Sequence, residues 1–137
     1  MDKSNLSESD LCDKFIRPAM EKAGWNGLDQ IFREYPLRAG RVVVRGNKAY
    51  RDKSTVLRAD YALFYKANIP LAVVEAKDNK HAVGAGMGQA LNYAQLLDVP
   101  FSFSSNGDGF VFRDATLATG VLEQNLTLEE FPSPEEL

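Results

Sequence analysis

Two carboxylates and a lysine are the residues of this sequence whose types and spacing could do chemistry. Asp60 lies near the start of one apolar run, and Glu75 and Lys77 lie two residues apart at the end of the next run. Carboxylate oxygens suit Mg²⁺, which usually takes only one or two carboxylates and keeps its waters for a phosphate substrate. A lysine beside such an ion can position a water or help to deprotonate it. The alternative, an ordinary salt bridge at a strand end, stays open on these three residues alone.

A β-hairpin is the element that must bring these side chains together. Two apolar runs, residues 59–65 and 71–77, flank a turn over residues 66–70, which is the pattern of two paired strands. Such a hairpin returns Asp60 to a position beside Glu75. Three apolar residues before Glu75 predict a strand that is covered on both sides. Side chains alternate between the faces of a strand, so one face carries Leu71, Val73, Glu75 and Lys77, and the other carries Ala72, Val74 and Ala76.

A helix is predicted to precede these strands. Residues 7–23 carry apolar side chains every four positions, with Ser7 as an N-cap and Glu8 at the top of the apolar face. Glu8 either interacts with the helix dipole or reaches over the core towards Asp60. Pro18 is expected to kink this helix or to shift its start, because it removes a backbone donor.

A second helix is predicted over residues 85–97, after a glycine-rich start. Gln89 and Tyr93 are four residues apart and share a face of this helix, at the border of its apolar stripe. By themselves they indicate an ordinary polar margin, and the glycines do not form a phosphate-cradling motif. Further hairpins are predicted over residues 38–50 and 101–112, from turn residues between apolar runs. The stretch from Asn26 to Tyr35 fits no single element.

The charge of the chain is unevenly spread. The formal net charge is −3, but residues 33–58 carry eight basic and two acidic side chains, a net +6. A basic block just ahead of a carboxylate site suits a polyanion held near a metal, and the candidate contacts in this block are Arg41, Arg45 and Arg58. The alternative is a solvated hairpin with charged outer faces.

Length and composition predict one soluble domain. A chain of 137 residues fits a single domain, and no run approaches the roughly 18 apolar residues of a membrane helix. A single cysteine excludes an internal disulfide and fits a reducing cytoplasm. We expect residues 1–122 to form the domain. Residues 123–137 are rich in Glu and Pro, which predicts a linker towards a further part of a longer protein.

The order of these features resembles the PD-(D/E)xK nuclease superfamily. The run Glu75-Ala76-Lys77 with an upstream Asp is a short motif. A Gln-x-x-x-Tyr pattern on the following helix narrows the resemblance to the N-terminal nuclease domain of type I restriction enzyme R (motor) subunits. Glu8 fits the acidic residue of the first helix in that group, whereas Ala59 replaces the proline of the superfamily's name. The resemblance implies an α/β fold in which helices flank a central mixed β-sheet.

The resemblance also implies a role for each residue of the site. Asp60 and Glu75 would ligate Mg²⁺, together with the backbone carbonyl of Ala76. Lys77 would orient the attacking water and steady the charge that builds on the phosphate. Glu8 would assist through a metal-bound water or a second ion.

By the same resemblance, the chain would cut double-stranded DNA without sequence choice of its own. Gln89 and Tyr93 would contact DNA or brace the site. Specificity and methyltransferase subunits would be its partners, and ATP would act only in motor domains beyond residue 137, driving translocation before cleavage. The alternative is a catalytically silent module of the same fold that serves as a DNA clamp or a docking surface.

Overall fold

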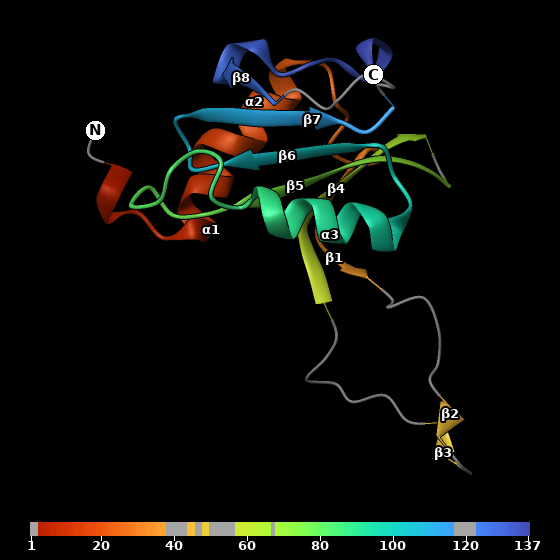
Figure 1. Ribbon diagram of the computed structural model, residues 1–137. Helices are drawn as coiled ribbons and strands as arrows, with labels where there is room; N and C mark the ends of the chain where they lie inside the picture. The colour runs from red at the N-terminus through yellow and green to blue at the C-terminus, as the bar shows by residue number, and fades with distance from the viewer. Residues whose placement is uncertain (1–2, 38–43, 46–47, 50–56, 67, 117–122) are drawn as a thin grey trace.

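A six-stranded mixed β-sheet forms the centre of the molecule (Figure 1). The computed structural model describes residues 3–37, 44–45, 48–49, 57–66, 68–116 and 123–137. The strands follow one another across the sheet as β1 (Ile31–Leu37), β4 (Leu57–Lys66), β5 (Ile69–Ala76), β6 (Phe101–Ser105), β7 (Gly109–Asp114) and β8 (Gln124–Thr127). Strands β5 and β6 run parallel, and the other neighbouring pairs run antiparallel. The predicted α/β fold with a mixed sheet is confirmed.

Helices cover both faces of this sheet. Figure 1 shows α3 (Met87–Leu97) in front of it, whereas α1 (Glu8–Leu11) and α2 (Arg17–Lys22) lie behind. α3 links the parallel strands β5 and β6, which need such a crossover. The described residues include no helix that is long and apolar enough to cross a membrane. The part of the chain that the structure describes also contains short 3₁₀ turns at Lys3–Asn5, Leu128–Glu130 and Pro134–Glu136.

The first helix is less regular than its sequence pattern predicts. Ser7 is the N-cap, and it exchanges hydrogen bonds with Asp10 in a capping box. A π-helical segment, Cys12–Ile16, then separates α1 from α2. Pro18 is the second residue of α2, and its missing N–H and bulky ring disfavour regular α-helical bonding one turn earlier. A π-helical segment therefore precedes the proline in place of a regular α-helical turn.

The predicted central hairpin is present as β4 and β5. Its turn is shorter than expected, because Lys66 already pairs with Ile69. Strand β5 is covered on both sides, as its apolar run predicts. Its side chains at 72, 74 and 76 pack with the π-helical segment and α2, and Val73 packs under α3. Leu71 departs from the predicted alternation, since it packs on the α1–α2 side near an irregularity in the strand register.

The flanking hairpins are also found. Strands β6 and β7 pair antiparallel across the predicted turn at residues 106–109. Strands β2 (Val44–Arg45) and β3 (Lys48–Ala49) pair antiparallel within the basic block. The expected turn between β2 and β3 lies outside the described residues. Residues 31–37, part of which the sequence pattern left unassigned, form β1 at the edge of the sheet.

The expected linker over residues 123–137 is instead part of the fold. Strand β8 pairs with β7, Phe131 is 4% exposed, and Trp25 Nε1 donates a hydrogen bond to Pro132 O at 2.8 Å. The acidic residues that suggested a linker serve local bonds: Glu130 and Glu136 close capping boxes at the two C-terminal 3₁₀ turns. A few well-placed apolar side chains outweigh the polar composition of this segment.

Candidate active site

Asp60 and Glu75 lie opposite each other where strands β4 and β5 separate. The paired register of the two strands stops at Tyr61 and Val74, one pair before these acids. At this point carboxylate side chains accept the backbone N–H groups of Asp60 and Ala76. The backbone N–H of Asp60 donates to Glu75 Oε2 at 2.7 Å, and the backbone N–H of Ala76 donates to Asp60 Oδ2 at 2.8 Å. Each carboxylate therefore binds the backbone of the opposite strand, which fixes the two acids side by side.

This arrangement is electrostatically unfavourable for the two acids. Glu75 is 2% exposed, and burial, together with the negative charge of Asp60, raises its pKa to about 8. Burial also raises the pKa of Asp60, although the N–H of Ala76 and the charge of Arg33 act in the opposite direction. Neighbouring carboxylates in a dry site resist ionising together. A cation between them would remove that penalty.

Glu8 and Lys77 complete the group. Glu8 begins α1, and burial followed by the charge of Asp60 raises the pKa of its carboxyl. Lys77 follows β5 directly, and its backbone N–H donates to Ser105 O at 2.9 Å. The Lys77 ammonium opposes the upward pKa shift of all three acids, so its field reaches each of them. The structure thus brings the four predicted catalytic residues to one end of the sheet.

Arg33 is a member of this group that the sequence analysis missed. It lies on β1, where its Nη1 donates to the backbone oxygen of Asp60 at 3.3 Å and stands 3.8 Å from Asp60 Oδ1. The sequence signal was weak, because Arg33 opens the basic block inside a stretch that fits no single element. Its place beside Asp60 follows from strand pairing rather than from spacing along the chain.

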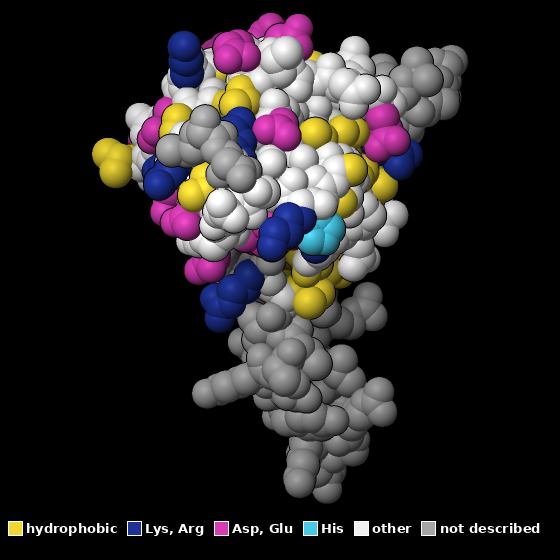
Figure 2. All heavy atoms as spheres, turned by 90° about the vertical axis from the view of Figure 1, so that its left-hand side faces the viewer, with side chains coloured by type: hydrophobic (Ala, Val, Ile, Leu, Met, Phe, Trp, Pro, Cys, Tyr) yellow, Lys and Arg dark blue, Asp and Glu magenta, His cyan; other side chains and the backbone are white. Residues whose placement is uncertain are grey.

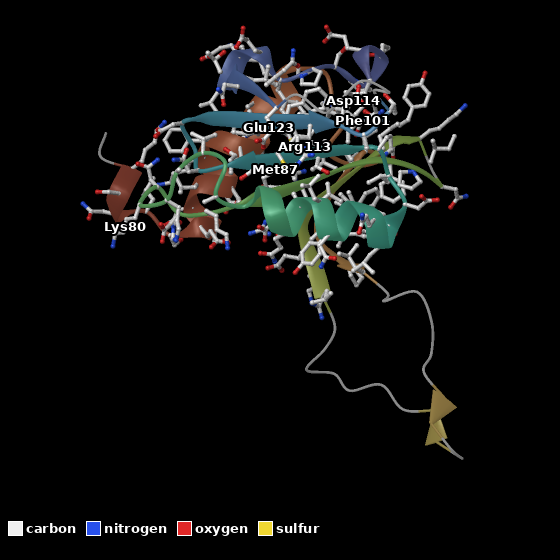
Figure 3. All side chains as sticks on the ribbon, in the orientation of Figure 1. Lys80, Met87, Phe101, Arg113, Asp114 and Glu123 are labelled. Carbon is white, nitrogen blue, oxygen red and sulfur yellow. The ribbon has the colours of Figure 1, made fainter. Side chains whose placement is uncertain are left out.

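Buried polar side chains hold the loop that follows Lys77. Ser104 on β6 is fully buried and accepts the N–H of Gly86 at 2.9 Å. Asn106 Nδ2 donates to a carbonyl of the same loop at 2.6 Å. A Cβ on Gly86 would lie 3.4 Å from the Cβ of Glu75, so the loop packs closely against the acid. Figure 3 labels Lys80 in this loop, at the end of the sheet where α1 lies.

The rim of the site carries charges of both signs. Figure 2 views this side of the molecule, where the single histidine lies among basic and acidic side chains. His81 Nδ1 lies 2.9 Å from Asp78 Oδ1, and hydrogen bonds from His81 and from the Lys80 backbone lower the pKa of Asp78. This acid is therefore engaged within its own loop.

The predicted DNA-contacting residues are more scattered. On α3, Gln89 Nε2 donates to Tyr93 Oη at 2.6 Å. Tyr93 is buried in the core beneath α3, whereas Gln89 and Arg58 are exposed. Arg41 and the side chain of Arg45 lie outside the described residues. The roles assigned to these five residues stay predictions.

The donors at this site fit a Mg²⁺ ion with few protein ligands. Among the described residues, no group of three or more His, Cys, Asp or Glu side chains could hold a metal ion. The donors that fit are the carboxylates of Asp60 and Glu75 and the backbone oxygen of Ala76, with water in the remaining positions. Mg²⁺ is commonly held by one or two carboxylates and several waters.

Known proteins are similar to this chain in sequence and in fold. The family model "Type I restriction enzyme R protein N terminus" matches residues 47–119. A curated Escherichia coli protein, the type I restriction enzyme EcoAI endonuclease subunit, is 56% identical over 135 residues, which cover 98% of this chain. A solved structure, the fragment of a putative HsdR subunit of a type I restriction enzyme from Vibrio vulnificus YJ016, is 40% identical, with a TM-score of 0.78 over 96% of the chain.

The chain spans a small part of these relatives. It covers 16% of the Escherichia coli protein and 24% of the Vibrio vulnificus chain. The family match includes β4, β5 and α3, and hence Asp60, Glu75 and Lys77. On this match, the chain belongs to the family of type I restriction enzyme R protein N-terminal regions.

Proposed function

We propose that this chain is the Mg²⁺-dependent endonuclease domain of a type I restriction enzyme R protein and hydrolyses phosphodiester bonds of double-stranded DNA. The observation that carries the proposal is the crossed pair of hydrogen bonds that holds Asp60 and Glu75 together on adjacent strands. Ligands fixed by strands keep their geometry better than ligands on loops. Membership in the family supports the same conclusion.

Asp60, Glu75 and the backbone oxygen of Ala76 would hold the ion. When bound, Mg²⁺ would neutralise charge on the scissile phosphate and make a coordinated water more acidic. The raised pKa of Glu75 describes the metal-free site, and a nearby cation would favour the ionised carboxylate. The two strands therefore supply a site in which a bound cation would offset the repulsion between the two carboxylates.

Lys77 and Glu8 would act on the nucleophile and the phosphate. Among the described residues, Lys77 forms no ion pair within 4.0 Å, which leaves its ammonium free to donate to the attacking water and to a phosphate oxygen. Glu8 begins α1, where the charges of Asp60 and Lys77 act on its carboxyl, and it would accept a hydrogen bond from a water of the ion. We propose that Gln89, Tyr93 and Arg58 contact DNA or brace the site.

The wider role follows from the longer relatives. We propose that cleavage is non-specific within this domain and follows ATP-driven translocation by motor domains outside this chain. Specificity and methyltransferase subunits would choose the target, and the complex would act in the cytoplasm. The fragment alone is then expected to cut weakly or not at all.

Metal binding is the direct test of the site. Titration calorimetry with Mn²⁺ is expected to show binding to the chain, weakened at least about tenfold by Asp60→Asn or Glu75→Gln. Both amides keep an oxygen that can accept the backbone N–H, so the local fold is preserved. Glu129→Gln, an exposed acid on the C-terminal 3₁₀ turn, is the matched control. Unchanged binding in both site variants would show that the metal-site assignment is wrong.

A further inference from the structure

Asp60 is held by side chains on both of its flanks. The β1–β4 register passes from the pair Arg33 and Tyr61 to the pair Tyr35 and Ala59, and skips Asp60. On the β5 side, the N–H of Asp60 goes to Glu75. On the β1 side, the backbone oxygen of Asp60 accepts a hydrogen bond from Arg33 Nη1 at 3.3 Å. Both polar backbone groups of Asp60 therefore bond to side chains, the N–H to Glu75 and the oxygen to Arg33.

A residue with a strained backbone lies at this gap in the register. Glu34, which would pair with Asp60, has a φ of 53°, in the left-handed region that glycine favours. Such a conformation typically costs on the order of 1 kcal/mol for a non-glycine residue. Strain of this kind persists where surrounding contacts hold it, and Arg33 Nη1 also lies 3.9 Å from Glu34 Oε1. One guanidinium thus contacts both residues of the missing pair.

Arg33 itself is held in place. Its Cζ lies 5.3 Å from the centre of the Tyr61 ring, and Tyr61 is 0% exposed. A guanidinium is a planar fork that can address two acceptors at once and can stack on an aromatic ring. Nη1 makes the contacts with both the backbone oxygen and the carboxylate of Asp60, while the guanidinium lies close to the Tyr61 ring.

We propose that Arg33 is the positioning residue of the candidate site: it holds the backbone and carboxylate of Asp60 in the orientation that binds the metal ion. This inference rests on the proposed function. The rival account makes Arg33 a simple counter-ion of Asp60. The two accounts predict opposite effects, because removing a nearby positive charge should strengthen the binding of a divalent cation, whereas losing the orientation should weaken it.

Mn²⁺ titration of the 137-residue chain separates the two accounts. Arg33→Met keeps the apolar stem and removes the fork, and we expect the half-saturating Mn²⁺ concentration to rise about 10- to 100-fold. Arg17→Met is the matched control, since Arg17 also bonds a carboxylate (Glu21) and a backbone oxygen (Gly27) away from the site. Circular dichroism verifies that each variant is folded.

Each outcome decides the proposal. Unchanged or tighter Mn²⁺ binding in Arg33→Met overturns it and leaves the proposed function intact, provided that Asp60→Asn still weakens binding. If the unaltered chain binds no Mn²⁺, the proposed function and this inference both fall. Where Arg33→Met does not fold, Arg33→Lys carries the test, because a lysine keeps the charge but not the fork. Weaker binding in Arg33→Lys supports positioning, and binding equal to that of the unaltered chain overturns it.

Discussion

At the scale of single residues, the site places two carboxyl groups, whose negative charges repel each other, side by side. Glu75 is buried beside Asp60, and its pKa is raised from 4.5 to about 8. In the unfolded chain this acid ionises near its ordinary pKa, whereas in the metal-free fold it keeps its proton to higher pH. The unfolded state therefore binds fewer protons between these two values, so the stability contributed by this group falls as the pH rises through that window.

Glu75→Gln is expected to remove most of this pH dependence. The amide carries no charge at any pH, so in EDTA the variant should be more stable than the unaltered chain at pH 8, by on the order of 2 kcal/mol, and similar to it at pH 4.5. Urea denaturation at the two pH values measures the difference. Glu129→Gln is the control, because its carboxylate is exposed. Parallel stability curves for Glu75→Gln and the unaltered chain would contradict the argument.

At the scale of elements, two segments with weak sequence patterns take part in the fold: one supports the site and the other closes the core. Strand β1 brings Arg33 to Asp60, and its strained Glu34 lies at the gap in the ladder there. The C-terminal segment packs Phe131 against Phe103, Phe110 and Trp25. The C-terminal segment is polar in composition and β1 mixes charged with apolar residues, so contacts with distant parts of the chain fix the structure of both.

Phe131→Ala tests the place of the C-terminal segment in the core. Truncating a large buried aromatic side chain typically costs about 3–5 kcal/mol, and Phe131 is enclosed by three other rings. Urea denaturation is expected to show a loss of this size. Leu28→Ala, at a side chain that is 88% exposed, should change stability by less than about 0.5 kcal/mol. If residues 123–137 were a linker, Phe131→Ala would change the stability as little as Leu28→Ala does.

At the scale of the whole molecule, the site lies at one end of the sheet, where β5 ends, α1 begins and α3 follows. The relatives of this chain are several times longer, since it covers 16% of the Escherichia coli subunit and 24% of the Vibrio vulnificus chain. We expect the rest of such a protein to supply DNA translocation and control. Under the proposed function, cleavage would need that larger assembly, whereas metal binding would need only this chain.

Lys77→Ala in a full-length R protein, assembled with its partner subunits, is the test at this scale. Loss of an ammonium that orients water and phosphate should lower plasmid cleavage by about 10²-fold or more, while ATP hydrolysis by the motor continues. Lys80→Ala, a nearby lysine of the same loop, is the control and should cut normally. Full cleavage by Lys77→Ala would favour the catalytically silent module.

The sequence by itself determined which residues could do chemistry and which hairpin carries them. Two apolar runs on either side of a turn predict β4 and β5, and the turn returns Asp60 to Glu75, because strand pairing within a hairpin is local. The sequence also placed Glu8 and Lys77 at plausible ends of their elements, and the structure brings all four together.

Tertiary structure alone decided how the site is held. The crossed bonds between Asp60 and Glu75 need the two strands to separate at one particular pair. Arg33 reaches Asp60 from 27 residues away, and Phe131 closes a core built from both ends of the chain. Contacts of this kind depend on the packing of distant segments, whose partners leave no periodic signal in the local sequence.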